Sequence, residues 1–377
     1  MSVMVHTVRR SRAARARRAV FVAAAGAAVA LVASSCTGGA EPAPSGAVTR
    51  AASSSAAPTT PAKSTSSCTV SDKGVPTCGV LWGVATRPPT AAGVKAVEAK
   101  MGRPFDFVYR YHDLNDTIPD KSERAQVAGG QLLHVSIAAR DFSHPDRSQI
   151  GWADVAAGTY DEDLRKQAEG IASLKVPVFV TFEQEASQKG KVAVLGSPET
   201  FVKAWKHVHD LYQKAGVTNA VWVWVMTGSA DNLDNAAQMW PGNDYVDWIS
   251  WNVYNQSGCK GGRISEDKYV SFEDKMRIFY DFIETRGPSI GMDPAKPKMI
   301  SETGSARYPD NLKLTADWYA AIPSVLQRYP TIKAVSLWDS INGGCDYRFD
   351  QVPELSAAVA KAGMQPIVHA QPDVTVP

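Results

Sequence analysis

From Gly79 onward, one pattern repeats eight times: a short apolar or β-branched run, a polar loop, and a segment with helical periodicity. Strands that alternate with helices build parallel sheets, and eight units over about 285 residues fit a closed (β/α)8 barrel, or TIM barrel. The rival α/β architecture, an open doubly wound sheet, usually carries a glycine-rich phosphate loop after its first strand. No such loop follows the first strand candidate here. The eight strand candidates are Val80–Ala85, Phe107–Tyr111, Leu132–Ala138, Val176–Phe182, Ala220–Val225, Trp248–Val253, Lys298–Ser301 and Ile332–Leu337.

Helical segments are expected between these strands. Some carry start signals, such as Ser197-Pro198-Glu199, in which proline takes the first helical position. The last helix should stop at Gly363, which lies just past it. The clearest helix candidates are Thr90–Met101, Glu162–Leu174, Pro198–Ala215, Phe272–Arg286 and Asn311–Arg328, and the weaker ones are Lys121–Val127, Leu233–Met239 and Pro353–Ala362.

The first 36 residues have the organisation of an export signal. An arginine-rich start is followed by Ala19–Val32, an apolar run that is too short to span a membrane. The run ends at Ala33-Ser34-Ser35-Cys36, which is similar to a bacterial lipobox, although Ala33 stands where leucine is usual. We therefore predict an exported protein that is either a cell-envelope lipoprotein, anchored to the membrane only through lipidated Cys36, or a secreted protein.

A stretch rich in Ser, Thr, Ala and Pro follows the signal, from Thr37 to Ser67. Such a composition cannot bury enough apolar surface to offset the entropy of ordering the chain. We predict a flexible linker over residues 37–78, the barrel domain over residues 79–365 and a C-terminal tail over residues 366–377.

Four cysteines remain after Cys36, namely Cys68, Cys78, Cys259 and Cys345. An even number in an exported protein indicates two disulfides, which allows three pairings. We favour Cys68–Cys78, which would close a short loop at the start of the domain, together with Cys259–Cys345. These cysteines form no CxxC pair, so we predict no metal site, and no cofactor is expected.

The formal net charge is only +2, and the arginine-rich start supplies much of the positive side. A nucleic-acid partner is therefore not expected, because binding phosphates needs a basic face. The chain contains ten tryptophans, and tryptophan offers flat apolar surface to sugar rings or interfaces. The sequence carries no sign of oligomerisation, and we expect a monomer.

Two glutamates follow strand candidates at places where a barrel carries its active site, the C-terminal ends of the strands. Glu185 comes after the fourth candidate and Glu302 after the seventh. Glycoside hydrolysis needs such a pair: one acid protonates the leaving oxygen, and one carboxylate attacks the anomeric carbon or activates water. A single glutamate there could equally form a structural salt bridge or cap a helix. The pair, with aromatic residues at neighbouring strand ends, predicts a glycosidase acting on an oligosaccharide or polysaccharide.

Three stretches of the chain resemble glycoside hydrolase family 26. They are Val176–Phe179 leading to Gln184-Glu185, Trp240–Ile249, and Lys296–Gly304, and the second is the most specific. It resembles the family pattern Tyr-Pro-Gly-Asp-x-Tyr-Val-Asp-Trp-Ile-Gly. The resemblance extends from about Gly79 to Ala362 and implies a retaining enzyme, with β-mannan as the family's commonest substrate.

Matched residue by residue, the resemblance implies Glu185 as the acid/base and Glu302 as the nucleophile. It also implies that Tyr254 hydrogen-bonds the nucleophile and that Trp338 forms a platform under the sugar. For double displacement, Glu185 must carry a proton while Glu302 is ionised. Glu183 competes with Glu185 for the acid role, but it does not align with the family's glutamate and is expected either to support the catalytic residues or to form a salt bridge.

Two positions depart from the family. Gln184 stands where His usually precedes the acid/base, and Thr181 stands where Arg is usual. Gln184 can still donate a hydrogen bond to substrate, but the missing arginine removes a charge that would orient and tune carboxylates. The alternative to a retaining glycosidase is therefore a catalytically impaired, carbohydrate-binding lipoprotein on the same barrel. A purely structural lipoprotein is disfavoured by the intact carboxyl pair.

Several other side chains near the strand ends are candidates for substrate contact. The tryptophans could equally pack in the core, and the polar residues could equally hold loops. These further candidates are Trp82, Trp224, Trp251, His112 and Asp339.

Overall fold

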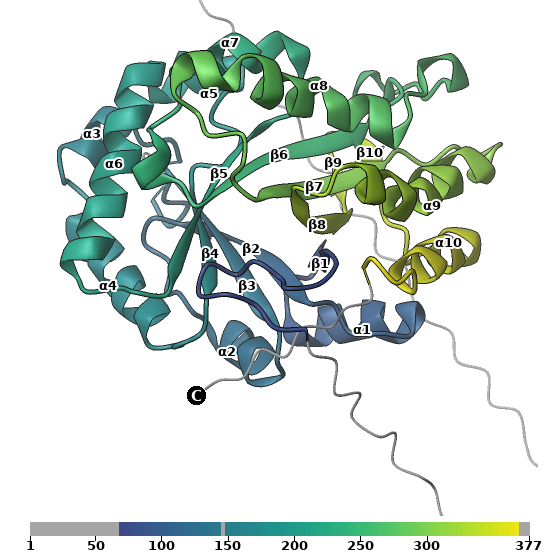
Figure 1. Ribbon diagram of the computed structural model, residues 1–377, viewed down its shortest axis with the longest axis horizontal. Helices are drawn as coiled ribbons and strands as arrows, with labels where there is room; N and C mark the ends of the chain where they lie inside the picture. The colour runs from purple at the N-terminus through teal and green to yellow at the C-terminus, as the bar shows by residue number, and fades with distance from the viewer. Residues whose placement is uncertain (1–67, 145–147, 369–377) are drawn as a thin grey trace, which may run out of the picture. The chain divides into compact units, whose positions relative to one another are not determined.

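The computed structural model describes residues 68–144 and 148–368. Eight parallel strands close a barrel in chain order, and β1 pairs with both β2 and β8 (Figure 1). The predicted (β/α)8 fold is confirmed, and each strand candidate corresponds to one observed strand. The strands are β1 (Leu81–Thr86), β2 (Phe107–Asp113), β3 (Leu132–Ala138), β4 (Val178–Phe182), β5 (Ala220–Thr227), β6 (Trp248–Asn255), β7 (Lys298–Ser305) and β8 (Ile332–Asp339).

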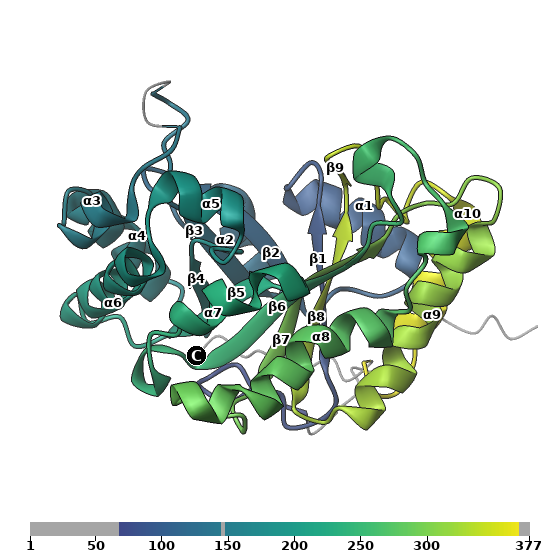
Figure 2. The same cartoon turned by 90° about the horizontal axis from the view of Figure 1, so that it is seen from above.

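Helices follow the strands and lie around the outside of the barrel (Figures 1 and 2). All the predicted helices are present, and α3 and α5 are additional. Gly363 is the last residue of α10 rather than the residue after it, and Met364 is the C-cap. The helices are α1 (Ala91–Met101), α2 (Lys121–Ala128), α3 (Trp152–Ala156), α4 (Asp161–Ala172), α5 (Lys189–Leu195), α6 (Pro198–Lys214), α7 (Leu233–Gln238), α8 (Phe272–Thr285), α9 (Leu312–Arg328) and α10 (Pro353–Gly363).

Short-range signals in the sequence account for several of these boundaries. Ser197 caps α6 by accepting from the Thr200 amide, with Pro198 at the first helical position. Asp120 and Glu123 form a reciprocal capping box at the start of α2. Two short strands, β9 (Ile341–Asn342) and β10 (Cys345–Asp346), pair antiparallel after β8. Within the described residues, no helix is long and apolar enough to cross a bilayer.

The interior of the barrel is filled by side chains that alternate along the strands with outward-facing ones. The layer nearest the strand starts is apolar. The next layer is partly polar: His134 bonds Thr181 Oγ1 through Nε2 at 2.8 Å and stacks on Tyr109. Burial lowers the pKa of His134 to about 3, so the ring is neutral. The apolar layer consists of Leu81, Phe107, Leu132, Phe179, Val221, Val223, Val225, Trp248, Met299 and Ala334.

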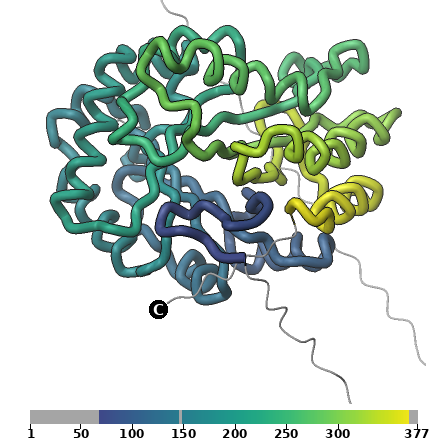
Figure 3. The backbone as a smooth tube through the Cα atoms, in the orientation of Figure 1, coloured from purple at the N-terminus to yellow at the C-terminus, as the bar shows by residue number. Residues whose placement is uncertain are grey.

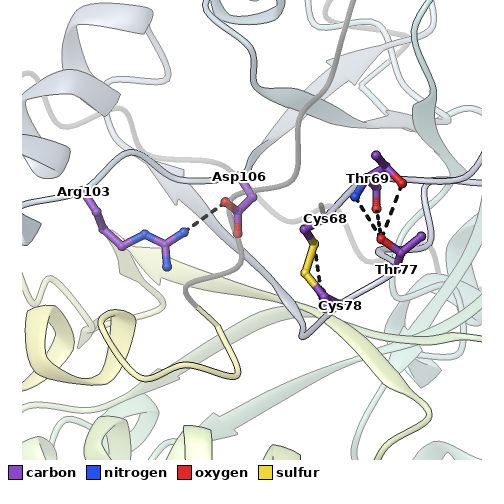
Figure 4. Close-up of a disulfide and its surroundings, with 6 residues drawn as sticks. All are labelled: Cys68, Thr69, Thr77, Cys78, Arg103 and Asp106. Atoms are coloured by element: carbon purple, nitrogen blue, oxygen red, sulfur yellow. Dashed lines mark hydrogen bonds and ion pairs between the residues drawn. A yellow bond between two sulfur atoms is a disulfide. The ribbon is translucent and has the colours of Figure 1, made fainter. Parts of the chain in front are cut away.

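A disulfide-closed loop covers the end of the barrel where the strands begin. The bridge joins Cys68 and Cys78, with Cα atoms 5.5 Å apart (Figure 4). Within the loop, the Lys73 carbonyl accepts from Trp248 Nε1 at 2.7 Å. Gly74 has φ of 67° and lies so close to Phe179 that a Cβ would clash with the ring. The linker prediction is therefore wrong at its end, because residues 68–78 pack as part of the barrel domain.

The C-terminal boundary also lies further along the chain than predicted. The Ile367 carbonyl accepts from the Val80 amide at 2.7 Å, and Val368 is buried. Arg103 Nη1 donates to the carbonyls of Gly363 and Val368. Figure 3 shows α1 and α10 side by side, and the two helices are in contact. The barrel domain thus extends at least to Val368, because its last residues cover the start of β1.

Both favoured cysteine pairings are confirmed. The second bridge joins Cys259, which follows β6, to Cys345 of β10, with Cα atoms 5.1 Å apart. It links loops at the C-terminal end of the barrel. The predicted export signal, Cys36 and residues 37–67 of the linker lie outside the described residues.

Candidate active site

Glu302 lies in β7 at the C-terminal end of the barrel and is only 7% exposed. Each of its carboxyl oxygens accepts a hydrogen bond from a tyrosine hydroxyl. Tyr111 of β2 donates to Oε1 and Tyr254 of β6 donates to Oε2, both at 2.7 Å. The carboxyl group is therefore held in one orientation by two strands on different sides of it.

The charge state of Glu302 is set by opposing effects. Burial, and then the negative charge of Glu185, raise its pKa to about 7, although the two tyrosine hydrogen bonds and Lys191 favour the ionised form. The pKa values of Tyr111 and Tyr254 are raised well above the ordinary value, first by burial and then by the charge of Glu302. Both tyrosines therefore remain protonated donors. Glu302, which double displacement requires to be ionised, binds a proton near neutral pH in the free protein.

Glu185 follows β4 on a loop with an unusual backbone. Glu183 and Glu185 both adopt left-handed conformations, with φ of 54° and 56°. For a residue with a Cβ, this conformation costs about 1–2 kcal/mol. Two main-chain hydrogen bonds hold it: the Glu183 amide donates to Ile137 O at 2.8 Å, and the Glu185 amide donates to Val225 O at 2.9 Å. The loop is thus bonded to both β3 and β5.

The two glutamates of this loop point to different surroundings. Glu183 is buried, and its carboxylate accepts from the Ala139 amide at 2.7 Å and from Lys191 Nζ at 2.5 Å. Glu185 is half-buried and accepts from Gln188 Nε2. Since the strand ends at Phe182, its alternation no longer places the two side chains on one face. Glu183 is a salt-bridge member, as expected, and Glu185 faces the open site.

Gln184 and Thr181, the two positions that depart from the family pattern, lie in different surroundings. Gln184 is half-buried, and its side-chain oxygen accepts from Ser136 Oγ at 2.5 Å. Thr181 is fully buried inside the barrel, where its hydroxyl donates to Val223 O at 2.8 Å. Thr181 therefore supplies neither charge nor contact to Glu185.

A cavity of about 280 Å³ opens beside Glu185. Tyr254 lines it together with Glu185, so the residue that binds Glu302 also faces this cavity. Asn252, only 4% exposed, is another lining residue and pairs with Glu302 in the β6–β7 ladder. Its side-chain oxygen and nitrogen have no hydrogen-bond partner within the described structure, and ligand hydroxyls could satisfy them. The remaining lining residues are Thr227, Gly228, Ser229, Ala230, Asp231, Val253, Gln256, Lys275 and Ile278.

Trp338 lies at the same end of the barrel and is 7% exposed. Its indole meets the Tyr111 ring edge-to-face, with ring centroids 5.6 Å apart. It packs in one cluster with Tyr347 and the Cys259–Cys345 bridge. The structure thus brings Trp338 beside the tyrosine that holds Glu302, while its role as a sugar platform stays a prediction.

Three tryptophans predicted as possible site residues point the other way. Trp224 donates from Nε1 to Met239 O at 3.2 Å, Trp251 stacks on Phe279 of α8, and Trp82 packs in the core outside the barrel. All three are buried among helices. The prediction of substrate contact is therefore wrong for them, because alternation along their strands turns them outward.

The prediction of substrate contact is also wrong for His112 and Asp339. His112 Nε2 bonds Glu123 Oε1 at 2.7 Å; although burial opposes its charge, hydrogen bonds to Asp116 and Glu123 raise its pKa to about 9. Asp339 accepts from the Phe349 amide at 2.9 Å, and burial, then the charge of Asp350, raise its pKa to about 7. Each side chain holds a neighbouring segment rather than facing the site.

Two contributors were missed in the sequence. Tyr111 could have been found, since Phe107 is the interior residue of β2 and a period of two places Tyr111 on the same face. Lys191 carried no signal, because α5 is a short helix within the loop after β4. Across residues 68–144 and 148–368, no group of three or more His, Cys, Asp and Glu side chains could hold a metal ion.

Known proteins share the sequence pattern and the fold. A sequence model of glycosyl hydrolase family 26 matches residues 162–327, a stretch that contains both Glu185 and Glu302. Endoglucanase H of Acetivibrio thermocellus is 22% identical over 286 residues, which are 73% of this chain and 29% of that protein. The chain therefore spans about three tenths of the length of this relative.

Solved structures with the same fold include three mannanases. The β-mannanase of Bacteroides ovatus has a TM-score of 0.56 at 16% identity, covering 78% of this chain and 90% of that one. The catalytic domain from Bacillus sp. JAMB-750 gives 0.56 at 14%, with coverages of 77% and 87%. The modular mannanase of Cellulomonas fimi gives 0.54 at 17%, with coverages of 77% and 71%. Neither the family match nor these proteins favour the binding-only alternative.

Proposed function

Because the chain belongs to glycoside hydrolase family 26, we propose that it is an exported, retaining glycosidase that cleaves a β-linked polysaccharide, with β-mannan as the first candidate. One observation carries this proposal. The buried carboxyl group of Glu302 is gripped by two tyrosine hydroxyls and feels the charge of Glu185 beside an open cavity. A fixed carboxyl group that interacts electrostatically with a second, more accessible one supports double displacement, which uses two carboxyl groups in different roles.

In the first step, the Glu302 carboxylate attacks the anomeric carbon while the glycosidic bond breaks, and Glu185 gives its proton to the leaving oxygen. In the second step, Glu185 takes a proton from water, the resulting hydroxide attacks the anomeric carbon, and the bond to Glu302 breaks. Gln188, which donates to Glu185, and the two tyrosines orient the carboxyl groups throughout.

The reaction also requires a defined protonation state of the two carboxyl groups. Burial, and then the negative charge of Glu185, raise the pKa of Glu302 to about 7, so Glu302 loses its proton as pH rises through neutrality. Glu302 receives two hydroxyl donors, which favour its ionised form. Double displacement requires that Glu302 is ionised and that Glu185 carries the proton in the complex that reacts.

The substrate proposal is supported by the neighbours and by the cavity. The similar solved structures are described as mannanases, and the curated relative as an endoglucanase, so β-glucan is the second substrate to test. The cavity beside Glu185 is lined largely by hydroxyl, amide and charged side chains, which suit the hydroxyl groups of a sugar.

The enzymatic proposal is tested with a panel of mannans, xylans and β-glucans, followed by proton NMR of the first anomer released. We expect β-mannan to be cleaved with retention. A 2-deoxy-2-fluoro-mannosyl fluoride should label Glu302, as peptide mass spectrometry would show. Full activity of a Glu302→Gln variant, or an inverted first product, would overturn the proposal.

Export is proposed from the first 36 residues, with lipidation at Cys36. The two disulfides support an oxidising compartment. The test is fractionation of bacteria that express the full chain. Wild type should fractionate with membranes and Cys36→Ala should not. Equal distribution of both forms would refute the lipid anchor, and retention of both in the cytoplasm would refute export.

A further inference from the structure

The backbone conformation of the loop that carries Glu185 depends on contacts with residues outside the loop. Two of its three consecutive residues, Glu183 and Glu185, occupy the left-handed region, which side chains with a Cβ rarely adopt. A conformation of this kind persists only when its surroundings over-determine it. The main-chain bonds to β3 and β5 fix the two outer residues, Glu183 and Glu185. The peptide between them, at Gln184, is held by a different group.

That group is the ammonium of Lys191 in α5. Its Nζ donates to the carbonyl oxygen of Gln184 at 2.5 Å and to Oε1 of Glu183 at 2.5 Å. The Glu183 carboxylate is in turn held by the Ala139 amide at 2.7 Å. The Lys191 side chain is 25% exposed, so the ion pair is largely removed from water. Lys191 thus bonds both residues that precede Glu185: the side chain of Glu183 and the main-chain carbonyl of Gln184.

We propose that Lys191 is a positioning residue, which fixes the backbone of the acid/base loop and thereby the direction of the Glu185 carboxyl group. This inference rests on the proposed function, because the orientation of Glu185 matters only if Glu185 exchanges a proton with the substrate. Lys191 also provides positive charge near the carboxyl pair, whereas Thr181 of β4 is turned into the barrel.

The charge of Lys191 bears on Glu302 as well. It is one of the groups that lower the pKa of Glu302 against burial and the Glu185 charge. Removing it also leaves the buried Glu183 carboxylate without its cation. Loss of the Lys191 charge would raise the pKa of Glu302 further. The ionisable groups that interact with Glu302 are Tyr109, Tyr111, Glu185, Lys191, Tyr254 and Tyr347.

The test compares Lys191→Met with Lys191→Arg, and uses Lys189→Met as the matched control. Lys189 begins the same helix and is exposed. For Lys191→Met we expect kcat to fall about 100-fold, the cost of a small misplacement of a reacting group, with little change in KM. Lys191→Arg should recover most of kcat because it can donate to the same oxygens. Lys189→Met should match wild type.

Two results would overturn the proposal. One is an unchanged kcat in Lys191→Met. The other is a loss of kcat that follows a loss of folded protein and that Lys191→Arg does not recover, since this pattern indicates a structural role alone. The double variant Glu183→Gln/Lys191→Met separates charge from position. It should stay slow if the bond to the Gln184 carbonyl matters, and wild-type kcat in it would contradict that bond's role.

A second readout does not depend on activity. Carbon NMR titration of the Glu302 carboxyl group in the full chain should show a higher pKa in Lys191→Met than in wild type. If wild type cleaves none of the polysaccharides, the proposed function fails while this titration still tests Lys191. An unchanged Glu302 titration, together with an unmoved Gln184-Glu185 peptide in a crystal structure of Lys191→Met, would reject the inference on structural grounds.

Discussion

Tyr254 donates its hydroxyl hydrogen to Oε2 of Glu302 across 2.7 Å, from a strand that neighbours β7 in the barrel. Tyr254 also lines the cavity beside Glu185. One tyrosine therefore contacts the first carboxyl group and shares a cavity with the second. This relationship makes the two glutamates one site, because a change at Tyr254 affects both the charge of Glu302 and the space in which Glu185 works.

Tyr254→Phe should lower kcat about 10- to 100-fold, because a hydrogen bond to a charged group contributes roughly 1.5–3 kcal/mol. Loss of this bond also raises the pKa of Glu302, which the bond lowers, so the acidic limb of the pH–rate profile should move to higher pH. Steady-state kinetics over pH 4–10 measure both effects. Tyr329→Phe, whose hydroxyl bonds Glu273 away from the site, is the control. An unchanged acidic limb in Tyr254→Phe would contradict this account.

Glu302 should also make stability depend on pH. Its pKa is raised in the folded protein from an ordinary 4.5 to about 7 by burial and the Glu185 charge, so the folded state binds the proton more tightly than the unfolded state. The resulting stability is present below pH 4.5 and is lost as pH rises through 7. At pH 8 the ionised Glu302 carboxyl group therefore lowers the free energy of unfolding by roughly 3 kcal/mol.

Glu302→Gln should therefore be more stable than wild type at pH 8, with the difference vanishing near pH 4. Urea unfolding at the two pH values measures the change. A Glu302→Gln variant that is equally destabilised at both would show that the carboxyl group is not strained by its burial. The comparison isolates Glu302 from Asp339, whose pKa of about 7, raised by burial and Asp350, is common to both proteins.

Asn252→Ala should lower kcat/KM about 10-fold or more without lowering stability. The buried amide has no partner within the described structure, so its removal breaks no internal hydrogen bond, and it would instead lose a bond to the substrate. The measurement pairs kinetics on the best polysaccharide with thermal unfolding. Reduced stability with unchanged kinetics would show that Asn252 serves the fold alone.

Trp338 and Trp251 should respond in opposite ways. Trp338→Ala removes a surface at the mouth of the barrel and should raise KM several-fold, because stacking on a sugar ring is lost. Trp251 lies between β6 and α8, so Trp251→Phe should leave KM unchanged while reducing stability by about 1–2 kcal/mol. An altered KM in the Trp251 variant would restore it as a site residue.

The two disulfides should differ in their effect on catalysis. Cys259→Ser/Cys345→Ser frees the loops that pack against Trp338, so stability should fall by about 2–4 kcal/mol and KM should rise. Cys68→Ser/Cys78→Ser frees the loop that contacts Trp248 at the start of β6, and it should reduce stability with KM unchanged. Equal KM values for both double variants would show that the Cys259–Cys345 bridge does not shape the site.

Most of the architecture could be read from local patterns. The strand candidates appear as observed strands because apolar runs of this length between polar loops bury themselves in any barrel with helices outside. The capped starts of α6 and α2 rest on neighbouring residues, so they too are visible in the sequence. The same reading placed Glu185 and Glu302 at strand ends, because position in a strand follows from the strand's own residues.

What the sequence could not determine is which side chains meet. The direction of Trp224, Trp251 and Trp82 depended on the phase of each strand relative to the barrel, and a shift of one residue exchanges inside for outside. The bond from Tyr111 to Glu302 joins residues far apart in the chain, and the bond from Lys191 lies in an irregular loop with left-handed residues. Neither kind of bond produces a periodic pattern in the sequence. The sequence by itself determined the eight-unit barrel and the two carboxyl groups at its mouth. Only the tertiary structure decided that Glu302 is buried between two tyrosines and takes up a proton near neutral pH, because burial and charge proximity are properties of the packed molecule.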